Sequence, residues 1–276
     1  SKIVYNLSIV ILLPFPTKVK HKFYKCKNFS RDPYAERHIY SIFTDRGVSR
    51  GILCYNKIAI EIPKPGRKDV LLLETETKTA IVTDSSCDLS DEQLKRYNIR
   101  MIPLRIICQN AEYRDRVDLN QDEIYDIMEN ELPKTSLPLA EDISAVYTEL
   151  IKDGYTDVIH LCISSGLSGT WNMIRIFAED YKDRLHIRVI DSKILSTGLG
   201  YMALAAAKAL EEGADADTAV QAAQAARNTQ LGMFVIRTLE YLRKGGRIGL
   251  VEGVLGNLLQ IKPIIFVNND GIYETL

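Results

Sequence analysis

The sequence predicts an α/β protein: a parallel α/β first domain, followed by the beginning of a second, incomplete α/β domain. From Lys78 onward, short β-rich apolar runs alternate with segments of helical periodicity, as in a parallel sheet with helices on its faces. One run, Val158–Ile163, is almost entirely apolar, which is typical of a strand covered on both faces. After Asn228 the pattern changes, and Asn268–Gly271 indicates a hairpin turn.

Local signals predict the elements one by one. The strand Thr79–Thr83 is followed by a capping box, Ser90 with Gln93, which opens a helix. Apolar residues at i, i+3, i+4, i+7 and i+8 predict an amphipathic helix at Ala140–Lys152, and Gly154 ends it. Further expectations are strands at Asn98–Ile107, His186–Ile190, Phe234–Ile236 and Pro263–Val267, helices at Gly198–Glu211 and Asp217–Arg227, and a helix that buries Trp171, Ile174, Phe177, Ala178 and Tyr181.

Composition and charge describe an ordinary globular protein with an unusual first segment. The 276 residues are 46% apolar and 26% charged, with a formal net charge of −1, which argues against nucleic acid as a main partner. Ser1–Thr77 is basic, with 14 Lys and Arg against 7 Asp and Glu, and beyond a strand region at Gly51–Ile62 it shows no derivable core. We expect it to be either a small interaction module or sequence upstream of the true start. The expected domains are residues 1–77 (unassigned), 78–228 and 229–276, the last cut short at Leu276.

Cysteine usage and hydropathy predict a cytoplasmic protein. The five cysteines are an odd number without a C-x-x-C pair, so we expect free thiols in a reducing compartment. The four histidines show no metal-ligand spacing, and we expect neither a metal nor another cofactor. The apolar run Leu7–Phe15 is too short to span a bilayer, so stable membrane insertion is not expected.

Three expected strands of the first domain end in polar groups. In an open parallel sheet the carboxyl ends of the strands line the crevice where ligands bind, so these groups should converge. The alternative is that each group only caps the helix that follows it. The candidate crevice-lining residues are Asp84, Ser85, Ser86, Asp191 and Ser192, together with Ser164 and Ser165.

The strongest of these groups is Ser164–Thr170, which we call the serine loop. It lies between a buried strand and a helix, and its glycines permit close backbone approach. The start of the helix offers unpaired N–H groups, and the hydroxyls of Ser165, Ser168 and Thr170 add donors, so the loop suits a carboxylate or a phosphate. It is not a Walker loop, because no Gly-Lys-Ser/Thr follows.

An alternative function is a serine-dependent hydrolase or phosphotransferase that uses the same loop. The segment Gly166–Thr170 misses the G-x-S-x-G nucleophile elbow by one residue. A hydrolase also needs a positioned base, and His160 and His186 lie in or at the start of expected strands.

Two other segments carry polar groups. Pro133–Pro138 is expected to be a rigid loop with two hydroxyls between two helices, or else a plain linker. Arg243–Ile248 places three cations around a Gly-Gly turn, where they could pair with an anion or an acidic partner, or else form a solvated loop.

Taken together and in this order, the segments resemble the DegV family over Lys78–Leu276. The family's loop usually reads Thr-Ser-Gln-Pro-Ser, whereas here Leu137 and Leu139 replace the Gln and the second Ser. The family's histidine near the carboxylate belongs to a C-terminal stretch that this sequence does not contain. The segments that carry the resemblance are Thr83–Leu89, Lys134–Ser136, Ser164–Thr170, Asp191–Ser192 and Leu239–Ile248.

The resemblance implies a lipid-binding subunit rather than an enzyme. Similar proteins hold a long-chain fatty acid between two α/β domains, and many serve a bacterial fatty acid kinase. Its catalytic subunit phosphorylates the presented carboxylate with ATP, and the acyl phosphate enters phospholipid synthesis. By motif position, Thr135 and Ser168 look like the carboxylate-binding hydroxyls, and Arg247 resembles the residue tied to the kinase partner or to phosphoryl transfer. The implied supporting residues are Ser136, Ser164, Ser165, Gly166, Gly169 and Thr170.

Overall fold

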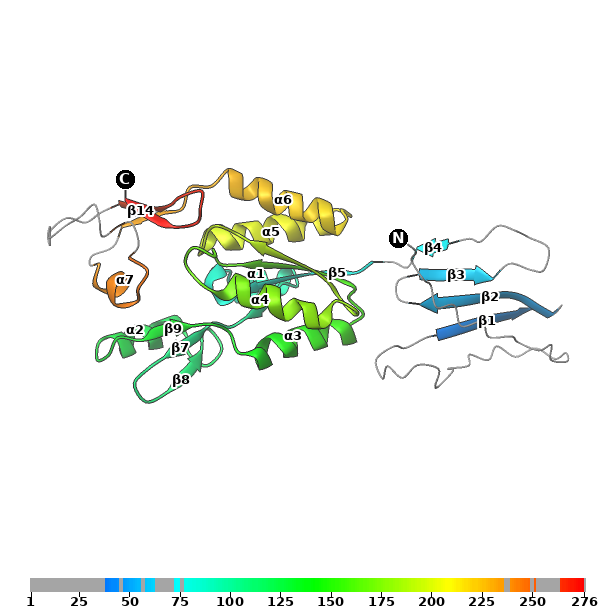
Figure 1. Cartoon of the computed structure of the whole chain (residues 1–276), viewed down its shortest axis with the longest axis horizontal. Helices are drawn as coiled ribbons and strands as arrows, with labels where there is room; N and C mark the ends of the chain where they lie inside the picture. The colour runs from blue at the N-terminus through cyan, green and yellow to red at the C-terminus, as the bar shows by residue number, and fades with distance from the viewer. Residues whose placement is uncertain are drawn as a thin grey trace, which may run out of the picture. The chain divides into compact units, whose positions relative to one another are not determined.

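A computed structural model describes residues 38–44, 47–55, 58–62, 72–74, 77–235, 239–248, 251 and 264–275. The chain divides into two compact units, Ser1–Glu76 and Thr77–Leu276. In the first unit, four strands form one antiparallel sheet in the order β1-β2-β3-β4 (Figure 1). The strand region expected at Gly51–Ile62 contains the end of β2 and all of β3, which pair with each other. The bounds are β1 His38–Thr44, β2 Gly47–Tyr55, β3 Ile58–Ile62 and β4 Leu72–Glu74.

The second unit is built on a parallel sheet, so the predicted α/β class is confirmed. Its strand order is β11-β10-β5-β6, and all three neighbouring pairs are parallel. Every residue of the central strand β10 is buried, as its apolar sequence predicts. The bounds are β5 Thr79–Asp84, β6 Arg100–Ile102, β10 Asp157–Cys162 and β11 His186–Asp191.

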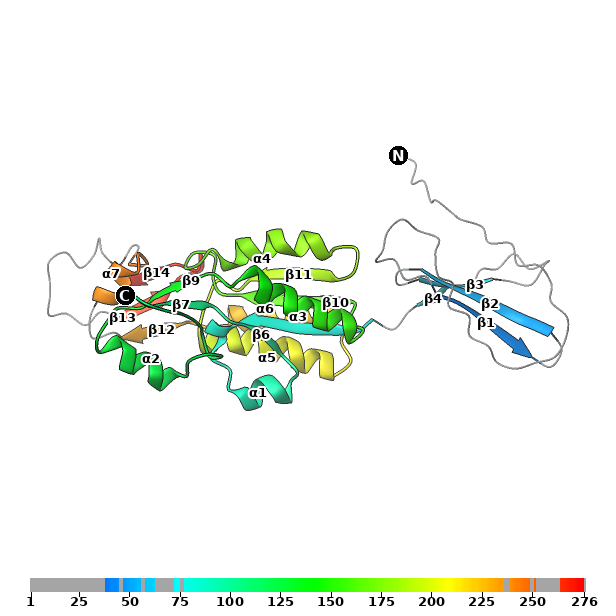
Figure 2. The same cartoon turned by 90° about the horizontal axis from the view of Figure 1, so that it is seen from below.

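Helices cover both faces of this sheet. On one face, α3 and α4 pack Ile143, Tyr147 and Ile174 against inward-facing residues of β5 and β10. On the other face, the alanine-rich helices α5 and α6 pack against Ile81, Ile159 and Leu161 (Figures 1 and 2). The small alanine side chains let the helices lie close to the sheet and to each other. The bounds are α3 Ala140–Lys152, α4 Thr170–Ala178, α5 Thr197–Glu211 and α6 Ala216–Asn228, and a 3₁₀ turn, η2, occupies Glu179–Tyr181.

The expected start of the first helix is present as a full capping box. The Ser90 hydroxyl accepts from the backbone N–H of Gln93, and the Gln93 side chain accepts from the N–H of Ser90. The helix that follows, α1, covers Asp91–Arg96, after a 3₁₀ turn, η1, at Ser85–Cys87. Within the part of the chain that the structure describes, no helix is long and apolar enough to cross a membrane.

A small antiparallel sheet in the order β8-β7-β9 corrects two expectations. The single strand expected at Asn98–Ile107 is divided between β6 of the parallel sheet and β7 of this one. The segment Pro133–Pro138 was predicted to be a loop, but its centre is the strand β9, which pairs with β7. The three-residue strand has little β-rich sequence of its own and is formed by pairing across about 30 residues, which local patterns do not reveal. The bounds are β7 Arg105–Ile107, β8 Glu112–Arg114, α2 Gln121–Met128 and β9 Lys134–Ser136.

The last elements form what we call the second lobe: β12, α7, β13 and β14. Its strands form an antiparallel sheet in the order β12-β13-β14, and the hairpin turn expected at Asn268–Gly271 joins the last two. Ile265, Val267 and Tyr273 pack against Leu167 of the serine loop in one apolar cluster. The bounds are β12 Met233–Val235, α7 Glu240–Lys244, β13 Ile264–Val267 and β14 Tyr273–Thr275.

Candidate ligand-binding site

The serine loop begins where β10 ends, at the carboxyl edge of the parallel sheet, and is fixed there by two carboxylates. Asp84, at the end of β5, accepts a hydrogen bond from the backbone N–H of Ile163 (2.7 Å). Asp191, at the end of β11, accepts one from the N–H of Ser165 (3.0 Å). The polar ends of three adjacent strands therefore meet at one edge.

The group at the end of β5 faces inward. Asp84 is fully buried, and its carboxylate also accepts from the backbone N–H and the hydroxyl of Ser86. Burial raises the pKa of Asp84, against the opposing effect of these hydrogen bonds. The buried Ser85 hydroxyl donates to Asp115 (2.6 Å) and accepts from the N–H of Leu104 (3.1 Å). Asp84 and Ser85 thus hold neighbouring backbone, and a ligand contact for them or for Ser86 stays a prediction.

The group at the end of β11 contains a cation that sequence reasoning missed. Lys193 places its ammonium 3.0 Å from the Asp191 carboxylate and 3.2 Å from the Ser165 hydroxyl. Burial favours a higher pKa for Asp191, but the hydrogen bonds from Ser165 and Lys193 outweigh it and lower that pKa. Ser192 is buried, and its hydroxyl donates to the carbonyl of Ile194 and accepts from the N–H of the same residue. The signal for Lys193 was its place directly after the Asp-Ser pair.

Ser168 lies at the start of α4. Its hydroxyl accepts from the backbone N–H of Thr170 (3.2 Å) and lies 2.8 Å from the Thr170 hydroxyl. The first turn of any α-helix leaves N–H groups without intrahelical acceptors, and they carry partial positive charge. Two hydroxyls and the open end of a nine-residue helix therefore occur together at this point.

Thr135 belongs to an adjoining segment. It lies on β9, where its partner in the register is Ile106 of β7, and it is exposed. Two residues further on, the Leu137 side chain lies against the serine loop, because a Cβ on Gly169 would be only 3.5 Å from Leu137 Cδ2. The structure thus brings the segment of Thr135 and Ser136 next to that of Ser168. The assignment of Thr135 and Ser168 to a ligand carboxylate stays a prediction.

Arg247 also adjoins the serine loop. Its side chain is exposed, its Nε donates to the Leu167 carbonyl (3.4 Å), and its Nη1 donates to Gly245. Leu167 is buried in the apolar cluster of the second lobe. The basic turn is therefore next to the loop, and its role toward a partner stays a prediction.

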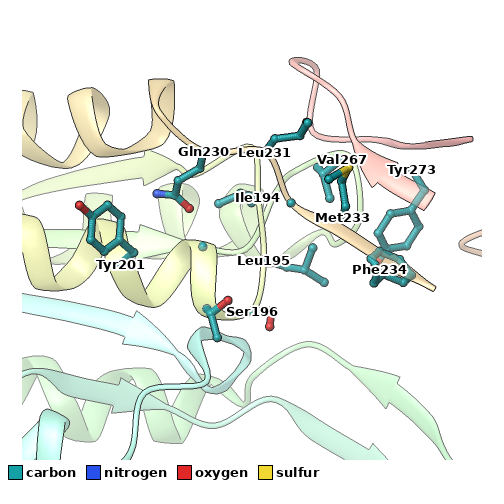
Figure 3. A pocket seen from close by; sticks show the side chains of 13 residues that line it. Ile194, Leu195, Ser196, Tyr201, Gln230, Leu231, Met233, Phe234, Val267 and Tyr273 are labelled. Atoms are coloured by element: carbon teal, nitrogen blue, oxygen red, sulfur yellow. The ribbon is translucent and has the colours of Figure 1, made fainter. Parts of the chain in front are cut away.

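An apolar cavity of about 740 Å³ opens beside this cluster, between the start of α5 and the sheet of the second lobe (Figure 3). Leu195, Phe234 and Tyr273 line the cavity and also pack in the cluster that contains Leu167. Its volume is within the range of ligand-binding pockets, and it opens to solvent, because Tyr201, Leu231 and Met233 in its lining are each more than half exposed. Its other lining residues are Ile194, Ser196, Thr197, Gly198, Tyr201, Gln230, Leu231, Gly232, Met233 and Val267.

Among the described residues, no group of three or more His, Cys, Asp or Glu side chains could hold a metal ion. The donors at the carboxyl edge are hydroxyls, amides and the Lys193 ammonium, which suit an anion rather than a cation. The arrangement therefore favours an anionic ligand.

Fold and site define a class: mixed α/β proteins with a parallel sheet whose polar loops gather at the carboxyl edge, beside an apolar cavity. The chain belongs to the DegV family, because residues 78–276 match the family model, which is described as "uncharacterised protein, DegV family".

Relatives of known sequence and structure agree with this assignment. A DegV domain-containing protein of Clostridium perfringens is 41% identical over 199 residues, which cover 72% of this chain and 70% of the relative. The crystal structure of DegV, a fatty acid binding protein from Bacillus subtilis, is similar with a TM-score of 0.66 at 30% identity, covering 72% of this chain and 70% of that one. A stearic acid-binding protein from Eubacterium ventriosum is similar with a TM-score of 0.65 at 31% identity, covering 72% and 70%.

Proposed function

We propose that this chain binds one long-chain fatty acid and presents its carboxylate to the catalytic subunit of a fatty acid kinase. The observation that carries the proposal is a hydroxyl-bearing helix start, Ser168 with Thr170, in the same loop as Leu167, whose apolar cluster also contains residues that line the cavity. Relatives at 30 to 32% identity from Bacillus subtilis and Thermus thermophilus are fatty acid binding proteins. This supports the same ligand class here.

The carboxylate is assigned to Thr135, Ser168 and the first-turn amides of α4. A buried carboxylate costs several kcal/mol unless donors surround it, and hydroxyls with a helix start provide such donors. The contact between Leu137 and Gly169 supports the approach of the two segments that bear Thr135 and Ser168.

The acyl chain is assigned to the cavity between α5 and the second lobe. Each buried CH₂ of the chain contributes about 0.8 kcal/mol, so the tail supplies most of the affinity and the carboxylate sets the orientation. In the kinase step, a carboxylate oxygen attacks the γ-phosphorus of ATP, which releases ADP and forms the acyl phosphate. Arg247 is exposed and lies beside the serine loop, which supports its assignment to contact with the phosphoryl donor or the partner.

A hydrolase at the same loop has less support. Of the histidines whose side chains the structure describes, His160 is fully buried and bonded to Tyr147 (2.7 Å). His186 lies at the amino end of β11, where it contacts Asp157. The serine loop is at the opposite, carboxyl edge of the sheet, so neither imidazole is placed to activate Ser168.

The first experiment is mass spectrometry of a denatured organic extract of the purified protein, with oleic acid added back where the yield is low. We expect about one acyl chain per protein, and no stoichiometric acyl chain after add-back contradicts the proposal.

A matched pair of variants tests the assignment of the tail. Leu231→Glu puts a charge into the cavity lining, whereas Ile176→Glu puts one on the outer surface of α4; the two side chains are 61% and 59% exposed. We expect Leu231→Glu alone to reduce the retained acyl chain by about tenfold or more, because an acyl chain that covers this part of the lining would have to remove water from the new carboxylate. Equal retention by the two variants contradicts the tail assignment.

The kinase step is tested by adding ATP and a bacterial fatty acid kinase catalytic subunit to the oleate-loaded protein. We expect hydroxylamine to trap an acyl phosphate only when both components are present. Acyl phosphate formed without the catalytic subunit would instead support the phosphotransferase alternative.

A further inference from the structure

The hairpin turn of the second lobe contacts the serine loop through one buried hydrogen bond. The Ser164 hydroxyl donates to the carbonyl oxygen of Gly271 (2.7 Å), and the same hydroxyl accepts from the N–H of Gly166 (3.1 Å). Ser164 is fully buried. The bond joins residues 107 positions apart and links the second lobe to the start of the loop.

The serine loop and the hairpin turn approach this closely because each has a glycine at the contact. A Cβ on Gly166 would lie 2.7 Å from the Gly271 oxygen, which is closer than real Cβ contacts. A Cβ on Gly271 would overlap the Ser164 hydroxyl, and it would lie 3.0 Å from the Lys193 Cα. Gly271 also has a φ of +79°, in the left-handed region that glycine adopts without strain.

The turn itself is held rigidly. The Asn268 side-chain oxygen accepts from the N–H groups of Asp270 and Ile272, both at 3.0 Å. Arg227, at the end of α6, donates to the backbone carbonyls of Lys193 (3.0 Å) and Asn268 (3.3 Å). The guanidinium therefore joins the turn to the loop that follows β11.

Ser164 connects the hairpin turn to the predicted carboxylate donors through its backbone carbonyl. Its carbonyl oxygen accepts from the N–H groups of Leu167 and Ser168, both at 3.0 Å. The orientation of the Ser164 peptide thus fixes the backbone of Ser168, whose hydroxyl caps Thr170 at the start of α4. A shift of Ser164 moves the donors of the proposed site together.

The geometry points to Gly271 as a positioning residue: the hairpin turn of the second lobe sets the orientation of the carboxylate-binding hydroxyl and amides through Ser164, without contacting the ligand. This inference rests on the proposed function. It makes ligand affinity depend on the docking of the second lobe as well as on the walls of the cavity.

The test compares Gly271→Ala with Gly154→Ala. Gly271 and Gly154 have nearly the same φ, +79° and +78°. A Cβ on Gly154 would have no atom within 4 Å, so Gly154→Ala introduces the same backbone strain without a steric contact. The readout is the fluorescence of Trp171, the one tryptophan of the sequence, which lies in the first turn of α4. We expect oleate to dissociate about tenfold faster from Gly271→Ala and within about twofold of the native rate from Gly154→Ala. Equal rates in the two variants overturn the inference.

A double variant guards against a general folding defect. Ser164→Ala removes the hydroxyl that a Cβ on Gly271 would overlap. We therefore expect Gly271→Ala to have a clearly smaller effect in the Ser164→Ala background than in the native protein, with only the backbone strain and the contact with Lys193 remaining, so that the two changes are non-additive. Effects that simply add overturn the proposed route through Ser164.

A ligand-free measurement separates this inference from the proposed function. Without any fatty acid, acrylamide should quench Trp171 more strongly in Gly271→Ala than in Gly154→Ala, because the start of α4 is less well held. If the native protein fails to bind oleate but the quenching differs in this way, the proposed function fails and the positioning role stands. Unchanged quenching in Gly271→Ala overturns the positioning role.

Discussion

The Tyr147 hydroxyl lies 2.7 Å from Nδ1 of His160, and both side chains are fully buried between α3 and the central strand β10. The Nε2 atom of His160 is buried and has no hydrogen-bond partner among the residues that the structure describes. Burial lowers the pKa of His160 from 6.5 to about 3, because a charged imidazole would lose its hydration here. The imidazole is therefore neutral in the folded protein at physiological pH.

This pair makes stability fall in mild acid. As the pH falls below 6.5, His160 becomes protonated in the unfolded chain but stays neutral in the folded protein until about pH 3. The free energy of unfolding therefore decreases as the pH falls from 6.5 to about 3. Relative to a Tyr147→Phe/His160→Leu variant, we expect the native protein to lose about 2 kcal/mol between pH 7.5 and pH 5.0. Urea unfolding followed by Trp171 fluorescence measures this difference.

The single variant Tyr147→Phe is the control, because it keeps the buried imidazole and with it the pH dependence. Asp84 and Asp115 have raised pKa values and favour the folded state as the pH falls, but they are common to all three proteins. A constant difference between native protein and double variant from pH 7.5 to 5.0 contradicts the assignment to His160.

Asp84→Asn should weaken the fold at the carboxyl edge. The carboxylate accepts from two backbone N–H groups and one hydroxyl, and an amide would direct its own donors at one of them. We expect a loss of about 1–3 kcal/mol in the free energy of unfolding, measured with urea at pH 7.5. Asp91→Asn, at a side chain that is 96% exposed, should change it by less than about 0.5 kcal/mol. Equal effects would show that Asp84 has no special role.

Gly200→Ala should destabilise the protein, although replacing glycine by alanine usually stabilises a helix. In an open helix this change stabilises by about 1 kcal/mol, but here a Cβ would overlap the carbonyl oxygen of Cys87 and crowd Leu89. We expect a loss of about 2 kcal/mol or more, and a lower melting temperature in calorimetry. Lys208→Ala, on the exposed side of α5, is the control. A stabilised Gly200→Ala protein would mean that α5 is not packed against η1 as described.

Ser168 can be tested for capping and binding separately. Ser168→Asp keeps an oxygen acceptor for the N–H of Thr170 and suits the helix start, so stability should stay within about 0.5 kcal/mol of native. A negative charge there repels a carboxylate, and we expect oleate affinity to fall by about tenfold or more. Ser168→Ala should lose about 1 kcal/mol of stability, because the N–H of Thr170 loses its hydrogen bond to the Ser168 hydroxyl. Undiminished oleate binding by Ser168→Asp would remove Ser168 from the site.

The elements with a strong period could be predicted closely. The bounds of α3 agree with the predicted Ala140–Lys152, because one apolar stripe and a terminal glycine define both its face and its end. The buried strand β10 and the capping box of α1 followed equally directly. Each of these features depends on residues within one short segment, where periodicity and hydrogen-bonding chemistry act alone.

The elements that depend on distant partners were harder to predict. The strand β9 forms because β7 offers its edge to Lys134–Ser136, and the loop prediction there was wrong. The contacts of Lys193 with Ser165 and of Gly271 with Ser164 were not predicted, because each joins residues that are far apart in the sequence.

By itself, the sequence determined the α/β class, the alternation of strands and helices around the parallel sheet, and the polar groups at the ends of three strands, because these follow from residue periodicity and from short-range chemistry. The tertiary structure alone decided which of those groups face inward, as Asp84 and Ser192 do, and which remain at the open start of α4, as Ser168 does. It also decided that the second lobe reaches the serine loop through Gly271. The physical reason is that burial and hydrogen-bond partnership belong to the packed chain, where residues about 100 positions apart come into contact.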